Sequence, residues 1–231
     1  MKRCLYVLIL IAFNSNVSGQ YVIQTNELSG KFGLSVGTAL PQDNLAEMRG
    51  VQAGGAQTGL YFGLEYVLPF KNNEYFSWQT DIRLITNETR LPEGFSNVGI
   101  TGNESNWFHI IPTLGLRFSP VSTKDFELFA VAQFGFAYII TPQIDSDVLL
   151  PGSAFTYKYQ RSTYGFTYAL SPAIGMKIFR NFELNAEYIY GGTVNYEAQV
   201  QGLNNSLLQQ DVEFKTPLKF LNIWANYHVY F

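Results

Sequence analysis

From residue 31 onward, apolar and polar residues alternate along most of the chain, which is the pattern of β-strands rather than helices. In the run 76–84, Trp78 and Ile82 fall on one face, and Asp81 and Arg83 fall on the other. Strands of water-soluble proteins are mostly about 5 to 6 residues long, whereas a tilted strand that crosses a membrane needs about 9 to 11. Eight runs have lengths of the second kind: 31–40, 57–68, 76–84, 107–118, 126–140, 163–179, 182–191 and 217–231.

The connections between these runs alternate in length. Short connections are expected at 69–75, 119–125 and 180–181, and long ones at 41–56, 87–106, 141–162 and 192–216. An even number of strands joined alternately by short turns and long loops is typical of outer-membrane barrels. The sequence therefore predicts an all-β fold, an eight-stranded antiparallel up-and-down transmembrane β-barrel. Its short turns and both ends of the mature chain would face the periplasm, and its long loops would face outside.

The sense of the alternation predicts which face meets lipid. A water-soluble ligand-binding barrel would turn its apolar face inward, but here the other face carries charges that are costly in lipid. Inside the barrel these charges can pair across strands and fill a narrow bore, so we expect a structural network and no steady open channel. A gated polar pore is the alternative. The inward charged residues are Glu65, Asp81, Arg83, Arg117, Glu127, Lys177, Glu183 and Glu187.

The first residues have the composition of an export signal. Lys2 and Arg3 precede an apolar run at 4–13, and Val17 to Gly19 provide small residues for cleavage before Gln20. Ten apolar residues are too few for a membrane-spanning helix, which takes about 20. We predict a signal peptide at 1–19 and a barrel domain at 20–231. The only cysteine, Cys4, would leave with the signal.

Composition and the positions of the histidines argue against several classes of function. A net charge of −3 argues against a nucleic-acid binder, and 16% aromatic residues argue against disorder. His109 and His228 are the only histidines, and their strands place them near opposite ends of the barrel, too far apart for one metal site. Ser105 with His109 is the one local pair that a lipid-modifying enzyme could use. We expect no metal, no cofactor and no catalytic set.

The last strand ends at Phe231, with Val229 and Tyr227 on the same face. A final aromatic residue preceded by apolar residues at two-residue spacing resembles the insertion signal of outer-membrane barrels. Aromatic residues also gather near the predicted periplasmic strand ends, as an aromatic girdle would require. With the eight runs, these features make the mature chain similar to the small eight-stranded outer-membrane barrels of the Bacteroidota. The resemblance implies a monomer in outer-membrane lipids, inserted by the barrel insertion machinery, with no catalytic residues.

Three functions are compatible with this sequence. The first is a non-enzymatic outer-membrane protein with a structural role or with outer loops that bind something outside. The second is an accessory subunit of an envelope complex for secretion, assembly or uptake, which would have a protein partner still to be identified. The third is a lipid-modifying enzyme or a conduit for small apolar molecules.

Overall fold

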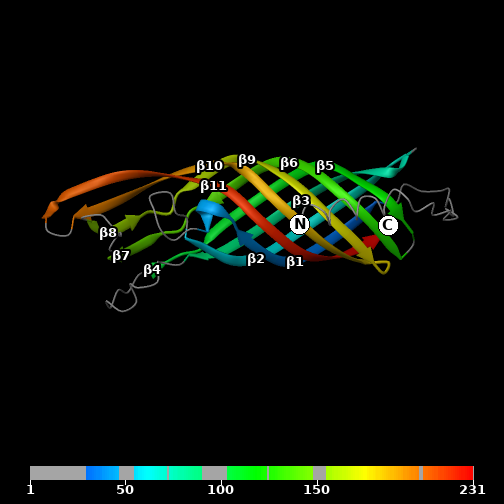
Figure 1. The fold of residues 1–231 in the computed structure, drawn as a ribbon, viewed down its shortest axis with the longest axis horizontal. Helices are drawn as coiled ribbons and strands as arrows, with labels where there is room; N and C mark the ends of the chain where they lie inside the picture. The colour runs from blue at the N-terminus through cyan, green and yellow to red at the C-terminus, as the bar shows by residue number, and fades with distance from the viewer. Residues whose placement is uncertain are drawn as a thin grey trace, which may run out of the picture.

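The computed structural model of the chain describes residues 30–46, 55–71, 73–89, 103–123, 125–147, 155–202 and 205–230. Eight long antiparallel strands close into a barrel, because the last strand pairs with both its predecessor and the first strand (Figure 1). The predicted fold class is therefore confirmed. The barrel strands, in spatial order, are β1 (Lys31–Pro41), β2 (Ala56–Phe70), β3 (Asn73–Thr89), β5 (Trp107–Ser122), β6 (Phe126–Ile140), β9 (Tyr164–Ile178), β10 (Phe182–Gly202) and β11 (Asn205–Tyr230).

The strand register fixes how the barrel closes. Lys31 at the start of β1 is paired with Tyr230 of β11, so the first strand begins and the last strand finishes at the same end of the barrel. The connections β2–β3, β5–β6 and β9–β10 are at this end, which we call the terminal end. Following the paired residues once around the barrel from Lys31 leads back to β1 at Pro41, ten residues further on. Such a stagger obliges the strands to tilt against the barrel axis.

At the opposite end, which we call the outer end, strands continue beyond the barrel (Figure 1). The prediction of a loop at 192–216 is wrong, because β10 runs to Gly202 and β11 starts at Asn205, and the two pair as a long hairpin. β10 also pairs with β8 (Phe155–Gln160), which pairs with β7 (Ile144–Asp147), which pairs with β4 (Asn103–Glu104). A strand that lies outside lipid needs no apolar face. The polar sequence of 192–216 therefore resembled that of a loop.

The outer wall of the barrel is apolar. Leu114, on the wall of β5, is 54% exposed, and large apolar side chains are similarly exposed on each of the other barrel strands. Near the terminal end, Phe76 packs against Phe118 and Phe182 packs against Tyr227, with ring centroids 5.1 and 5.2 Å apart. An exposed apolar band edged with aromatic rings is the surface that a membrane-spanning barrel presents to lipid. No helix among the described residues is long and apolar enough to cross a membrane.

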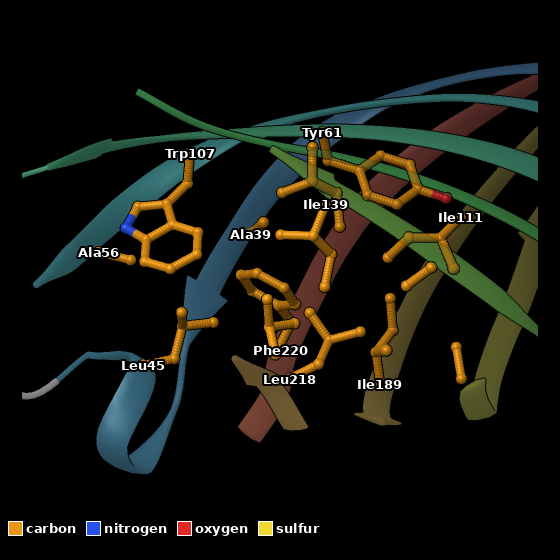
Figure 2. Close-up of a cluster of buried hydrophobic side chains, with 14 of the residues drawn as sticks. Ala39, Leu45, Ala56, Tyr61, Trp107, Ile111, Ile139, Ile189, Leu218 and Phe220 are labelled. Atoms are coloured by element: carbon orange, nitrogen blue, oxygen red, sulfur yellow. The ribbon is translucent and has the colours of Figure 1, made fainter. Parts of the chain in front are cut away.

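The interior has two layers of different chemistry. Toward the terminal end, most inward side chains are charged or amide-bearing and are almost fully buried. Toward the outer end they are apolar and aromatic, and they come together from all around the barrel (Figure 2). We call these the polar layer and the apolar layer. Leu45 of the short 3₁₀-helix η1 (Asp43–Leu45), which follows β1, also belongs to the apolar layer.

Candidate functional site

Arg117 organises the part of the polar layer nearest the terminal end. Its guanidinium donates to Glu183 through Nη1 and Nη2 at 3.1 and 2.8 Å, and to Glu127 Oε1 through Nε and Nη2 at 3.0 and 2.8 Å. The Phe129 ring lies against its flat face, with the centroid 3.4 Å from Cζ. β5 contributes Arg117 and β10 contributes Glu183, so this pair spans the bore between strands that are not neighbours. Bidentate pairs of this kind fix geometry as well as charge.

Two lysines complete the charge balance at this level. Lys31 Nζ lies 2.5 Å from Glu183 Oε1 and 3.9 Å from Glu127 Oε2, and Lys177 Nζ lies 3.6 Å from Glu127 Oε2. Lys31 was not among the expected network residues, although its inward position follows from the same two-residue period. It links the first strand to β10, so charges tie together strands on both sides of the β1–β11 seam.

His228 lies beside two carboxylates in the same layer. Its Nε2 is 2.8 Å from Glu65 Oε1, and its Nδ1 is 3.3 Å from Glu183 Oε1. These three residues could bring ligand atoms to one metal ion. However, Glu183 already forms ion pairs with Arg117 and Lys31, and Glu65 Oε2 accepts a hydrogen bond from Gln79 at 3.0 Å. Side-chain cations occupy the place that a metal would need, so the trio fits a charge network better than a metal centre.

Arg83 is the second centre of the polar layer, one step toward the outer end. Its Nη2 lies 2.8 Å from Asp81 Oδ2 and 2.6 Å from Glu187 Oε1, and its Nη1 donates to Thr113 at 2.9 Å. Gln133 donates to Asp81 at 2.7 Å and also accepts from Arg83. The structure thus brings all eight expected charged residues into the interior, within two linked arginine-centred groups.

The inward glycines make room for larger neighbours. A Cβ on Gly37 would overlap the Ile223 carbonyl oxygen and the side chain of Trp224, and one on Gly115 would overlap the backbone of β6. The ring of Trp224 in turn stacks on Tyr61, with centroids 4.9 Å apart. The sequence suggested that these glycines leave space in the bore, but neighbouring side chains fill that space.

The apolar layer was missed by the sequence analysis. It includes Tyr61, Trp107, Ile139, Leu218 and Phe220, all almost completely buried. The signal that could have shown it is the loss of alternation near the outer strand ends, as in 107–111, where five consecutive residues read WFHII. Apart from His109, this run is apolar on both faces, which indicates an apolar interior at that height.

His109 is a histidine buried among the side chains of the apolar layer. It is 0% exposed, lies parallel to the Trp107 ring at 6.0 Å, and meets the Phe220 ring edge-on at 4.9 Å. Neither ring nitrogen has a hydrogen-bond partner among the described residues. The hydroxyl of Ser105, its suggested partner in an enzyme, instead accepts a hydrogen bond from the backbone N–H of Gln143 at 2.6 Å. No hydrogen bond joins the two residues in the described structure, so the pair does not form a nucleophile and base.

η1 covers the apolar layer through a polar attachment to β11. The backbone N–H of Gln42 donates to the backbone carbonyl of Lys219 at 3.0 Å, and Lys219 Nζ donates to Asp43 Oδ2 at 2.6 Å. Asp43 has a φ of 49°, the left-handed region that a residue other than glycine rarely adopts.

Two of the three expected insertion-signal residues lie in the described structure. Tyr227 and Val229 are 45% and 53% exposed on the outer wall of β11, with Tyr227 against Phe182 of β10. Phe231 and the expected signal peptide lie outside the described residues.

Comparisons with known proteins give only distant likenesses. No family model matches the chain, and no curated protein matches it. Among solved structures, OprG of Pseudomonas aeruginosa is 14% identical over 87% of this chain and 95% of its own, with a TM-score of 0.45. A major outer membrane protein of Thermus thermophilus is 11% identical over 87% and 99%, with a TM-score of 0.47. The attachment invasion locus protein Ail of Yersinia pestis is 13% identical over 88% and 100%, with a TM-score of 0.40.

At these scores the fold rests on the strand pairing of this chain itself. A closed barrel with an apolar wall and a charged, filled interior is the architecture of an outer-membrane barrel. The expected membership of a Bacteroidota family stays a prediction.

Proposed function

We propose that this protein is a non-enzymatic outer-membrane barrel that presents a rigid β-sheet outside the cell as a binding surface. The observation that carries the proposal is the outer sheet, in which β10 and β11 extend beyond the barrel and pair onward with β8, β7 and β4. A protein that served only to stabilise the membrane would need no such extension. Binding residues are often placed on outer segments held by a rigid scaffold.

The filled interior supports a surface role over a conducting one. Arginine-centred ion pairs occupy the polar layer, and packed aromatic rings occupy the apolar layer. An eight-stranded barrel is narrow enough for side chains to fill it. The proposed orientation puts the terminal end in the periplasm and the outer sheet outside. It follows from export by a signal peptide at 1–19 and insertion from the periplasmic side through the signal ending in Phe231.

Cysteine labelling tests the orientation directly, because the only cysteine of the sequence, Cys4, lies in the proposed signal peptide. We would introduce Lys215→Cys in the outer sheet and Arg180→Cys in the turn between β9 and β10, two exposed positions at opposite ends. A membrane-impermeant maleimide should label intact cells at 215 and not at 180, and permeabilised cells at both. Labelling of intact cells at 180 alone would overturn the orientation and, with it, the proposed surface role.

The alternative of an accessory subunit is tested by a shortened hairpin in which an Asn-Gly turn replaces residues 197–213. The barrel should still form, since these residues lie beyond the pairing of β11 with β1. Both proteins would be extracted in mild detergent and analysed by size-exclusion chromatography with mass spectrometry. The proposal predicts a monomer with bound lipid in each case. A stoichiometric envelope protein in the full-length peak would make the chain an accessory subunit instead.

A further inference from the structure

His109 carries an inference that goes beyond the proposed surface role. A neutral imidazole has one N–H donor and one acceptor nitrogen, and each costs free energy when it is buried without a partner. Among the described residues, neither nitrogen of His109 is satisfied, and the side chain is completely buried. The other buried histidine, His228, has carboxylates beside both nitrogens. Of the two buried histidines, only His109 lacks a hydrogen-bond partner at both ring nitrogens among the described residues.

The surroundings of His109 indicate what kind of partner is missing. Its cross-strand neighbours on the inward face are Ile85 of β3 and Ile139 of β6, both buried. Trp107 stacks on one side, and Phe220 closes the layer from across the bore. A buried water is held by about two to four polar partners, and among these four neighbours only Trp107 carries a polar group, its indole N–H. A molecule with an apolar body and one polar group matches both the imidazole and the hydrocarbon around it.

The segment that covers this layer, η1, is held in place by weak contacts. Leu45 fills the outer side of the layer, close to Phe220 and Leu218 (Figure 2). Asp43, two residues earlier, holds η1 in place through an exposed ion pair with Lys219 and does so in a left-handed backbone conformation. Exposed ion pairs contribute little stability, and a left-handed aspartate is strained. Displacing η1 would withdraw Leu45 and free the room of one leucine side chain beside the aromatic rings.

We propose that the apolar layer is a binding site for a small, uncharged, mainly apolar molecule with one hydrogen-bonding group. The ligand takes the place of Leu45, packs its apolar body between Trp107 and Phe220, and places its polar group on His109. Phenol has this chemistry and is the probe for the test. The site is independent of the outer sheet, so either proposal can fail without the other.

The two histidines make the experiment internally controlled. In protein labelled with ¹⁵N-histidine and held in lipid nanodiscs, phenol should shift the imidazole signals of His109 saturably and leave those of His228 unchanged. Toluene, which has the shape of phenol without the hydroxyl, should bind about fivefold more weakly, the value of one hydrogen bond. Leu45→Ala should strengthen phenol binding because it removes the side chain that competes with the ligand.

A second variant separates hydrogen bonding from packing. His109→Phe keeps an aromatic ring and should abolish the preference for phenol over toluene in calorimetry against empty nanodiscs. Should this variant not fold, the titration of the unchanged protein still decides the matter. The proposal is overturned if the His109 signals do not move in either the unchanged protein or Leu45→Ala. It is equally overturned if phenol and toluene bind alike.

Discussion

Arg117 and Glu183 form a two-pronged ion pair across the inside of the barrel, with nitrogen–oxygen distances of 2.8 and 3.1 Å. The two residues come from β5 and β10, which are separated in the sheet by β6 and β9. Both side chains are almost fully buried. Because the contact joins opposite walls, it resists flattening of the barrel as well as neutralising two charges.

Removing one partner of this pair should be costly. Arg117→Met would leave Glu183 and Glu127 buried without their main cation, which typically destabilises a protein by about 3 to 5 kcal/mol. Urea titrations of the protein folded into lipid vesicles would measure the loss. Lys215→Met is the matched control, because Lys215 and Glu213 are 3.9 Å apart and more than half exposed. Its cost should stay below about 1 kcal/mol, and equal effects of the two changes would contradict a structural role for the interior pair.

A closed barrel should resist mild SDS. We expect unboiled protein to migrate differently from boiled protein on a gel, because eight strands with no open edge unfold only as a whole. The measurement needs no variant. Co-migration of the two samples, together with solubility in water without detergent, would exclude the membrane-spanning barrel.

The lipid-facing wall should reject charge. Leu114→Arg places a cation within the apolar band and should destabilise the barrel by about 2 to 4 kcal/mol in a bilayer. Asn195→Arg, at an exposed position on β10 beyond the band, is the control and should change stability by less than about 1 kcal/mol. Comparing their urea midpoints in vesicles tests the position of the membrane along the barrel. Identical midpoints would mean that Leu114 does not face the hydrocarbon of the bilayer.

Gly37 should not tolerate a side chain. Gly37→Ala would drive a methyl group into the Ile223 carbonyl and the Trp224 side chain on β11, where neither backbone nor packed ring can move cheaply. We expect a loss of about 3 kcal/mol or failure to refold, since overpacking of this kind strains the backbone. At Gly30 the added methyl would meet the end of the Tyr66 side chain at 2.9 Å, which can swing away. Refolding yields of the two alanine variants should therefore differ clearly.

Deleting Phe231 should reduce insertion into the outer membrane and leave export intact. The expectation rests on the resemblance of the last strand to the insertion signal, in which the final aromatic residue is recognised. Fractionation of cells would then find the truncated chain in the periplasm with its signal peptide removed. Normal amounts in the outer membrane would show that Phe231 is dispensable.

The sequence alone determined the strands and the direction of their side chains. A strand has a period of two, so each inward residue, from Glu65 on β2 to Glu187 on β10, could be assigned from its neighbours without knowledge of the fold. The expected strands at 31–40 and 126–140 match β1 and β6 almost residue for residue. Lipid makes this possible, because it requires one face to be apolar along the whole crossing.

Only the tertiary structure decided which inward residues meet. Arg117 reaches Glu183 because closure with a ten-residue stagger brings β5 and β10 to face each other at that height, and no local pattern encodes that offset. The same closure gathers Trp107, His109 and Phe220 into one apolar layer. Beyond the bilayer, lipid no longer imposes the apolar face. The length of the β10–β11 hairpin is therefore set by backbone pairing, which residue types at 192–216 do not reveal.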